Sequence, residues 1–337
     1  MIEDKIEIVI PTYNRAEYLD ITLNSLLNSP FKDCKITIRD NASPDNTQTI
    51  CNKYSKLFTN LHIIRNKKNI GGNANILRSY EQATYPYVWV LADNDLLNFD
   101  DCDDFIEAIE SEKFDLIICC SASYMYENNR NPTFDDDGIA EFIRKKRNND
   151  EDYLINSAKD LALMIKKYYF IITTFIPSVI YKTSFIDSES LIKGYDYISL
   201  SYPHYAFSIK ALNKNILTYK TEKDVVLAQA NPKDSEISDL TLFYRHLESS
   251  LLIEDKEIRP FASEFVTSGS FFYNLFAFII VAKSNGDESL KNNVFNLIGT
   301  IYKLKGWFKG FFYQLFISLC YCIPKKLCDL ACEIKMK

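Results

Sequence analysis

Five apolar residues at positions 87–91 follow one another without interruption. A run of this length is typical of a β-strand that is buried on both faces, as in a parallel sheet covered by helices. Two carboxylates, Asp93 and Asp95, come directly after the run, with Asn94 between them. Because open α/β sheets bind ligands at the carboxyl ends of their strands, these hard oxygen donors can hold a divalent cation there. The alternative is a solvated turn, since Asp and Asn are common turn residues.

The rest of the first 120 residues alternates between strand and helix patterns. Apolar runs predict strands at 5–10, 35–40, 61–65 and 115–120, and helical spacing predicts helices at 17–28, 46–58, 73–83 and 101–112. This alternation predicts an α/β fold with a Rossmann-like, mostly parallel sheet and helices on both of its faces.

The alternation stops after residue 120. Polar and basic stretches at 128–137 and 144–147 predict a solvated insertion. Beyond them, the patterns predict strands at 175–181, 216–219 and 225–230, and helices at 157–167, 240–253, 261–282 and 288–305, with a further helix begun by Pro203. We therefore expect an α/β domain over residues 1–235, with halves 1–120 and 121–235, and a helical C-terminal region over residues 236–337.

An apolar stretch near the C-terminus, residues 311–323, is 13 residues long. As a helix it extends for about 20 Å, which is too short to span a hydrocarbon core of about 30 Å. It can lie in a membrane interface, where neighbouring lysines reach lipid phosphates, or it can be a buried helix of a C-terminal cap. These lysines are Lys303, Lys305, Lys309, Lys325 and Lys326.

Composition and the absence of certain motifs argue against several classes of protein. The net charge of −6 disfavours nucleic acid as a partner, because phosphate backbones require a basic face. The nine cysteines show no C-x-x-C spacing and the first residues do not resemble a signal peptide, so we expect a cytoplasmic protein with reduced thiols. The sequence has neither a G-x-G-x-x-G after the first strand nor a P-loop motif, which argues against dinucleotide-binding and P-loop proteins.

Polar residues also follow the first two predicted strands. Residues 11–15 follow the first strand, and Asp40 ends the second. A loop at 69–75 contains two adjacent glycines and precedes a helix, whose N-terminus can offer N–H groups to a phosphate. Because the carboxyl ends of parallel strands meet at one edge, we expect these segments to lie beside the aspartate pair.

Together these segments resemble the nucleotide-sugar-binding half of family 2 glycosyltransferases, which have the GT-A fold. The matching segments are residues 8–15, 39–45 and 69–73 and the pair Asp93 and Asp95, all in the first third of the chain. Each segment by itself is a weak signal, whereas all four in this order are a strong one.

The resemblance implies roles for individual residues in binding a nucleotide-diphospho-sugar donor. Asp40 is expected to accept a hydrogen bond from an N–H of the base, typically uracil. The residues expected to shape or line the nucleotide site are Pro11, Thr12, Tyr13, Asn14, Asn69, Gly72, Asn73, Asp93 and Asn94. For Asn14 the alternative is a role in capping the following helix.

The resemblance also implies that a divalent cation, Mg²⁺ or Mn²⁺, is a cofactor. Asp95 is expected to be its ligand at an exposed strand end, with Asp93 at both the ribose and the metal. The metal would neutralise the leaving diphosphate, where negative charge develops during the reaction.

The second half of the chain departs from the family pattern. Many family members carry a Glu-Asp pair before a helix, and one of these carboxylates is the general base. The corresponding stretch here, residues 194–205, has no such pair. Asp196 and His204 are the candidates for the base, with Glu189 a poorer one; Asp196 can also be a turn residue and His204 a structural or metal-binding one.

The resemblance therefore implies an inverting, metal-dependent glycosyltransferase whose acceptor is a glycan or a lipid-linked sugar in surface polysaccharide assembly. The expected location is cytoplasmic, with peripheral contact on the inner face of the cytoplasmic membrane. Two alternatives are a nucleotidyltransferase of sugar activation, although its usual Gly-rich basic loop after the first strand is missing, and a non-catalytic module that binds nucleotide sugars.

Overall fold

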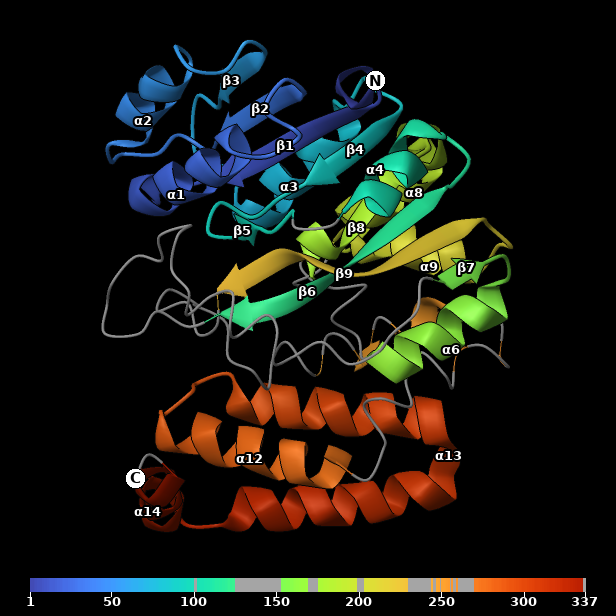
Figure 1. The fold of residues 1–337 in the computed structure, drawn as a ribbon. Helices are drawn as coiled ribbons and strands as arrows, with labels where there is room; N and C mark the ends of the chain where they lie inside the picture. Colours follow the sequence, from blue (N-terminus) through green and yellow to red (C-terminus); the bar gives the residue numbers. More distant parts are fainter. Residues whose placement is uncertain are drawn as a thin grey trace. The chain divides into compact units, whose positions relative to one another are not determined.

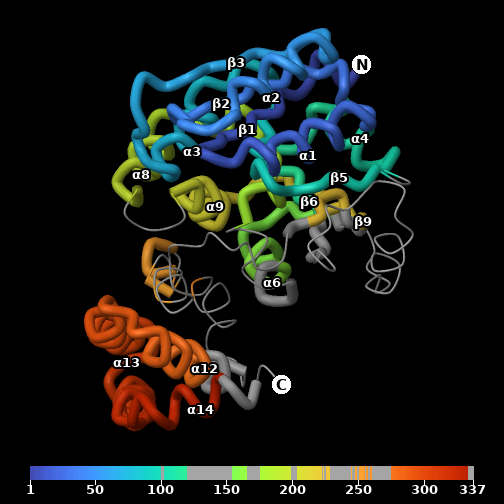
Figure 2. The backbone as a smooth tube through the Cα atoms, turned by 90° about the vertical axis from the view of Figure 1, so that its left-hand side faces the viewer, coloured from blue at the N-terminus to red at the C-terminus, as the bar shows by residue number. Residues whose placement is uncertain are grey.

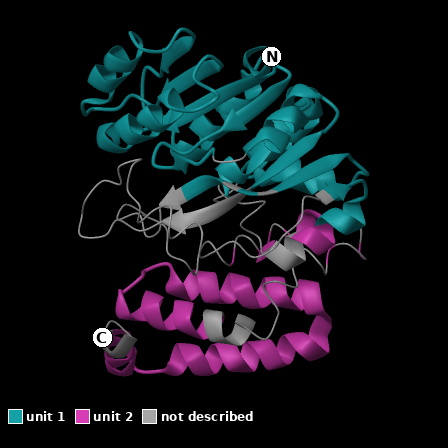
Figure 3. Cartoon of the chain, viewed as in Figure 1, with its two compact units in different colours: residues 1–161, 171–232 teal, residues 162–170, 233–337 magenta. Residues whose placement is uncertain are grey.

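The computed structural model describes residues 1–99, 102–124, 153–168, 175–198, 203–229, 244, 247–248, 250–254, 256, 259 and 270–335. The chain divides into two compact units (Figure 3). Unit 1 comprises Met1–Leu161 and Ile171–Pro232, and unit 2 comprises Ala162–Phe170 and Lys233–Lys337. The insertion predicted at 128–137 and 144–147 lies outside the described residues.

The described part of unit 1 is built on a nine-stranded sheet in the order β3-β2-β1-β4-β8-β6-β9-β5, with β7 also paired to β9 (Figure 1). The strands are β1 Ile6–Thr12, β2 Lys35–Asp40, β3 Leu61–Arg65, β4 Tyr87–Val90, β5 Leu96–Leu97, β6 Leu116–Tyr124, β7 Tyr153–Ile155, β8 Val179–Lys182 and β9 Thr218–Gln229. Strands β3, β2, β1 and β4 are mutually parallel, as are β6 and β9. The antiparallel strand β8 lies between β4 and β6. The predicted mostly parallel α/β sheet is therefore confirmed.

Helices cover both faces of this sheet, as predicted. They are α1 Ala16–Leu27, α2 Thr47–Tyr54, α3 Gly72–Glu81, α4 Asp103–Glu110, α8 Ser188–Asp196 and α9 Tyr205–Leu212. Helix α6, Ala158–Tyr168, begins in unit 1 and continues into unit 2. Figure 2 shows α1 and α4 on one side of the sheet and α3, α8 and α9 on the other. Helices α1, α2 and α4 contribute to one apolar core against the first face.

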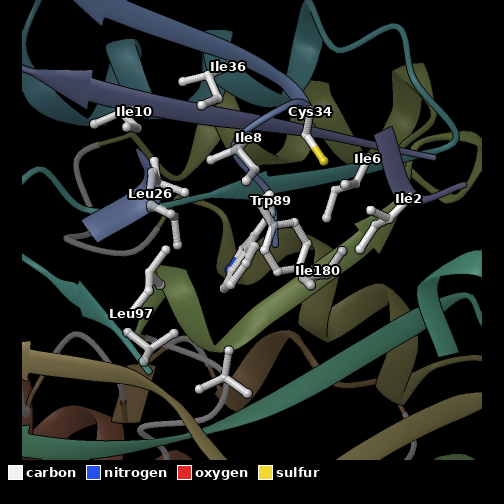
Figure 4. Close-up of a cluster of buried hydrophobic side chains, with 14 of the residues drawn as sticks. Ile2, Ile6, Ile8, Ile10, Leu26, Cys34, Ile36, Trp89, Leu97 and Ile180 are labelled. Carbon is white, nitrogen blue, oxygen red and sulfur yellow. The ribbon is translucent and has the colours of Figure 1, made fainter. Parts of the chain in front are cut away.

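Trp89 on β4 lies at the centre of that core (Figure 4). Its ring makes edge contacts with Phe31 and Phe105, and its Nε1 donates a hydrogen bond to the Pro177 carbonyl at 2.8 Å. On the opposite face Tyr80 of α3 packs against aromatic rings of β8 and α9. Residues 87–91 are all fully buried, which confirms the prediction of a strand covered on both faces.

The structure differs from the sequence predictions at three places in the second half of unit 1. The strands expected at 216–219 and 225–230 are one continuous strand, β9, in which Lys220 pairs with Ile118 of β6 and both Lys220 and Thr221 are fully buried despite their polarity. Helix α8 was not predicted, although Asp187 caps it by accepting a hydrogen bond from the Ser190 N–H. The helix expected after Pro203 is present as α9, which begins two residues later at Tyr205 and has His204 as its N-cap.

Unit 2 is helical in its described part. Its helices are α12 Ser270–Ser284, α13 Leu290–Cys322 and α14 Lys325–Lys335, with a short 3₁₀ helix at Ser250–Leu252. Gly306, at φ +75°, interrupts α13, and the two segments fold back beside each other (Figure 1). The helical prediction for 288–305 is confirmed, whereas 240–253 and 261–282 lie largely or partly outside the described residues. Among the helices described, none is both long enough and apolar enough to cross a membrane.

Candidate functional site

The carboxyl ends of β1, β2 and β4 meet at one edge of the sheet, as the sequence predicts. Thr12 at the end of β1 is paired in register with Asp40 at the end of β2. The Thr12 hydroxyl also donates a hydrogen bond to Asp93 Oδ2 at 2.7 Å, in the segment after β4. One short side chain therefore connects the first strand to the aspartate pair and fixes the spacing of the edge.

Asp40 is fully buried and accepts three hydrogen bonds. The Ser43 backbone N–H donates to Oδ1 at 2.8 Å, and Gln48 Nε2 and Arg65 Nη1 donate to Oδ2 at 2.7 and 2.9 Å. Arg65 is brought there by β3, where it is paired in register with Asp40. The Arg65 side chain is 41% exposed, so the ion pair presents its cation, rather than its carboxylate, to solvent.

Four asparagines form a second network beside this pair. Asn69 Oδ1 accepts hydrogen bonds from Asn41 Nδ2 and from the Gly71 N–H, both at 2.8 Å. Asn66 Nδ2 donates to Asn41 Oδ1 at 2.9 Å and to Asn75 Oδ1 at 3.1 Å. These bonds hold the loop that leads into α3 in place.

Gly72 and Asn73 are the first residues of α3. Gly71 before them adopts φ +89°, a conformation that glycine takes without steric cost, and no described side chain caps the helix. Asn73 Nδ2 donates a hydrogen bond to the Ile198 carbonyl at 2.8 Å. The N-terminus of α3 therefore opens at the edge and is joined to the segment after α8.

The aspartate pair is buried, which overturns both the solvated-turn alternative and the expected exposed position of Asp95. Asp93 is 4% exposed and Asp95 is 2% exposed, with Asn94 half-buried between them. Asp93 Oδ1 accepts from Arg15 Nη1 at 3.1 Å. Burial raises the pKa of Asp93, while Arg15 and the Thr12 hydroxyl act in the opposite direction. The Asp95 carbonyl accepts a hydrogen bond from Thr22 on α1, which holds the turn against that helix.

The loop after β1 contains the other residues expected in the nucleotide site. Pro11 is half-buried within β1, and Tyr13 is 42% exposed. Asn14 is exposed, adopts φ +57°, and donates its N–H to Ser43 Oγ at 2.9 Å. Asn14 does not cap α1; instead Asp45 Oδ2 accepts from the Ala16 N–H at 2.9 Å. The helix-capping alternative for Asn14 is therefore wrong.

The donor chemistry of the aspartate pair fits a divalent cation. Asp93 and Asp95 supply hard carboxylate oxygens on one turn, and Mg²⁺ is commonly held by one or two carboxylates together with substrate phosphates. Within the described ranges, no three His, Cys, Asp or Glu side chains form a group that could hold a metal ion. A cation at this pair would therefore take further oxygen ligands from a bound diphosphate and from water.

The two candidates for the general base flank residues 199–202, which are not described. Asp196 is the last residue of α8 and is exposed, so it is not in a loop turn. His204 directly precedes α9 and is 2% exposed. The Asn73–Ile198 hydrogen bond places the segment after Asp196 beside the N-terminus of α3.

Sequence reasoning missed Arg65, Gln48 and Asn66. Arg65 is the last residue of a strand whose bounds, 61–65, were predicted correctly. The strand-end rule that identified Asp40 also applies to this third strand, and it would have found Arg65. Gln48 and Asn66 carry no comparable signal, because their roles arise from side-chain contacts across the edge.

Comparisons with known proteins bear on the family of the chain. Residues 7–170 match the family model described as "Glycosyl transferase family 2". The chain is 29% identical over 237 residues to abequosyltransferase RfbV of Salmonella typhimurium, which covers 67% of each chain. It is 30% identical over 94 residues to GalNAc(5)-diNAcBac-PP-undecaprenol beta-1,3-glucosyltransferase of Campylobacter jejuni, a match to 28% of this chain and 30% of that relative.

The fold agrees as well. The crystal structure of S. aureus TarS 1-349 in complex with UDP matches with a TM-score of 0.62 at 17% identity, over 98% of this chain and 92% of that chain. Residues 7–170 therefore carry a glycosyl transferase family 2 domain, and the fold is the GT-A-like one that the sequence predicts. As a glycosyltransferase, it is neither of the two alternatives that the sequence left open.

Proposed function

We propose that this glycosyltransferase moves a sugar from a nucleotide-diphospho-sugar, with UDP as the nucleotide, to a glycan or lipid-linked acceptor in surface polysaccharide assembly. The observation that carries the proposal is the convergence of Asp40, Arg65, Thr12 and Asp93 at one edge of the sheet. The name of the C. jejuni relative includes a PP-undecaprenol acceptor, and TarS is solved with UDP, which support the acceptor and donor classes.

The uracil base of the donor is proposed to bind at the Asp40–Arg65 pair. Uracil offers one N–H donor between two carbonyl acceptors, which matches a carboxylate beside a guanidinium. Because Asp40 is fully buried beneath Gln48 and Arg65, one of these two side chains must shift before the carboxylate can meet the base N–H. Tyr13, Asn14 and the remaining residues expected in the nucleotide site surround the rest of the donor.

The diphosphate is proposed to lie between the aspartate pair and the N-terminus of α3. Asp95 and Asp93 would hold Mg²⁺ or Mn²⁺, whose charge neutralises the leaving diphosphate. Arg15, now paired with Asp93, is close enough to the same site to contact a phosphate once that carboxylate binds a cation. The N–H groups at Gly72 and Asn73 add further donors.

The acceptor hydroxyl is proposed to attack the anomeric carbon directly, with inversion. The bond from that carbon to the diphosphate oxygen breaks as the new glycosidic bond forms, and the hydroxyl proton passes to Asp196 or His204. Asp196 is exposed and is the more accessible of the two, whereas His204 is buried.

We also infer that the C-terminal region contacts the membrane surface on which a lipid-linked acceptor is held, at the inner face of the cytoplasmic membrane. The 311–323 stretch, which was expected either in a membrane interface or buried in a cap, is helical. One of its faces packs in the core of unit 2 at Ile317 and Cys320, while Phe312 and Leu319 are 55% and 63% exposed. The exposed apolar face supports the interfacial interpretation.

The proposal is tested by measuring UDP release from a panel of UDP-sugars, with and without lipid-linked acceptors and in the presence of Mn²⁺ or Mg²⁺. Mass spectrometry then identifies a glycosylated product. We expect acceptor-dependent release that a chelator abolishes and that Asp95→Asn removes. Release that persists in excess chelator would contradict the metal role, and a donor panel in which only GDP- or CDP-sugars react would contradict UDP.

A further inference from the structure

A basic pocket lies in unit 2 at the turn where Gly306 interrupts α13. The cavity has a volume of about 660 Å³, which is within the range of small-ligand pockets, roughly 300–1,000 Å³. Lys303, Lys305 and Lys309 line it from α13, and Lys256 and Arg259 line it from the preceding segment. None of its nine described lining residues is acidic. Arg259 is fixed there by two hydrogen bonds from its guanidinium to the Ile253 carbonyl, at 2.8 and 2.6 Å.

The charge of this region differs from that of the whole chain. The sequence has no Asp or Glu between Glu288 and Asp329, whereas the protein as a whole has a net charge of −6. Glu254, Asp255 and Glu257 flank Lys256 and Arg259 in the sequence, whereas α13 itself places no acidic residue near Lys303 and Lys309. An anion with several oxygen acceptors, such as a phosphate group, is the ligand that complements them.

Exposed aromatic side chains form the rim of the same pocket. Trp307 and Phe308 line it and are 76% and 72% exposed. The apolar surface continues along the second segment of α13 at helical spacing, through Phe311, Phe312, Leu315 and Leu319, which are 49% to 63% exposed. A soluble phosphate requires no such surface, whereas a bilayer places phosphates directly above acyl chains. Aromatic rings are favoured at that boundary, with lysines reaching the phosphate layer.

We propose that this pocket binds the phosphate of an anionic membrane lipid while Trp307 and Phe308 enter the headgroup region. The inference rests on the membrane contact in the proposed function and adds the site and the lipid chemistry. The second segment of α13 then lies along the interface, with Ile317 and Cys320 packed in the core of unit 2. The fold back at Gly306 brings the lysines of the first segment to the same turn, where Tyr302 donates a hydrogen bond to Gln314 at 2.7 Å.

The first test compares two charge-matched double variants of the full chain in vesicle co-sedimentation. Lys303→Gln with Lys309→Gln removes two exposed lysines from the pocket, and Lys56→Gln with Lys291→Gln removes two exposed lysines outside it. On vesicles of equal parts phosphatidylcholine and phosphatidylglycerol, we expect the pocket variant to bind about 30-fold more weakly, at about fivefold per lysine. The control variant should bind like wild type, and pure phosphatidylcholine vesicles should bind both poorly.

The outcomes of this test separate the pocket from the membrane contact. Equal losses in both double variants would mean that only net charge matters, which overturns the pocket while leaving the membrane contact intact. Failure of wild type to bind anionic vesicles overturns both. Tight calorimetric binding of inorganic diphosphate without vesicle binding would assign the pocket to a soluble anion and also overturn the inference. UDP binding by the same samples reports on the donor site independently.

The second test uses the two tryptophans of the chain as reporters. Trp89 is fully buried, so an aqueous quencher such as acrylamide acts mainly on Trp307 in free protein. We expect anionic vesicles to protect Trp307 from the quencher and to shift its emission to shorter wavelength, and Trp307→Phe to lose the quenchable component. Unchanged quenching in the presence of bound vesicles would overturn the proposal that Trp307 and Phe308 enter the headgroup region. Protection that instead grows with protein concentration alone would assign this surface to self-association.

Discussion

Two regions differ in how their charged side chains are paired: the edge of the unit 1 sheet where β1, β2 and β4 end, and the turn of α13 at Gly306 in unit 2. At the edge, the buried carboxylates of Asp40 and Asp93 are paired with Arg65 and Arg15. At the turn, lysines and an arginine line a pocket with no carboxylate among its described residues. A ligand of the edge must therefore enter a network of paired charges, whereas a ligand of the turn meets a lining that is basic in its described part. The first arrangement favours selectivity, and the second favours attraction to any phosphate-bearing surface.

The largest expected effect separates chemistry from attachment. His204→Ala should lower kcat by roughly 10²–10⁴-fold with little change in donor affinity, because the attacking hydroxyl loses its proton acceptor. Asp196→Asn is the paired variant. Steady-state kinetics measures the loss of activity in each variant, and vesicle binding, measured on the same samples, should not change. If both variants transfer sugar at near wild-type rates, the base lies elsewhere in the chain.

Asp95→Asn is expected to have the next largest effect, a loss of about 10²–10³-fold in kcat, since charge stabilisation of the leaving diphosphate is removed. The change is isosteric, so the melting temperature should move little even though Asp95 is buried. Vesicle binding should be unchanged. A variant that keeps full activity in Mn²⁺ would show that the aspartate pair does not hold the metal.

Salt should act unequally on the two regions. Between about 0.1 M and 1 M salt the screening length falls from about 10 Å to 3 Å, and vesicle binding should weaken on the order of tenfold or more. UDP affinity should change less, because the carboxylates at the edge are buried and paired with arginines. Co-sedimentation and calorimetry over the same salt series measure both. If UDP affinity fell with salt as steeply as vesicle binding does, the predicted difference between the two regions would be contradicted.

The smallest expected effect concerns the junction of α8 and α9 in the acceptor half. The Lys210 hydrogen bond holds the pKa of Asp187 well below its usual value, and Asp187 also caps α8. Because the folded pKa is depressed, the stabilisation is present at neutral pH and is lost as the pH falls below about 4.

Asp187→Asn should therefore lower the free energy of unfolding by less than about 1 kcal/mol at pH 7, since asparagine also caps helices and the ion pair is partly exposed. The difference from wild type should shrink in acid. Urea unfolding at pH 7 and in acid measures this difference in the free energy of unfolding. A difference that grows in acid would contradict the predicted pH dependence.

The nucleotide half was predictable because its information is local. Strands β2 and β3 match their predicted bounds, and the polar residues after β1, β2 and β4 lie together as parallel strand ends must. Burial at that edge was not predictable, because it depends on partners distant in sequence. Asp40 is covered by Gln48 and Arg65.

The second half was less predictable because its pairing is non-local. Strand β8 joins β4 and β6 through Ile180, which pairs with Trp89 and with Ile117, and nothing in its own sequence sets the antiparallel direction. The buried Lys220 broke the apolar pattern of β9 and divided one strand into two in the prediction. Asp196 and His204 fall in this half, which is why two candidates for the base remain.

The central claim is that the edge of the sheet binds UDP through the Asp40–Arg65 pair, and calorimetric titration of UDP tests it most directly. Asp40→Asn preserves the shape of the side chain but removes the charge that fixes Arg65 and accepts the base N–H. We expect about 10- to 100-fold weaker binding, the usual cost of losing a charged hydrogen-bond partner. CDP, which lacks that N–H, should bind wild type more weakly than UDP. Equal UDP affinity for wild type and Asp40→Asn, with equal affinity for CDP, would contradict the account.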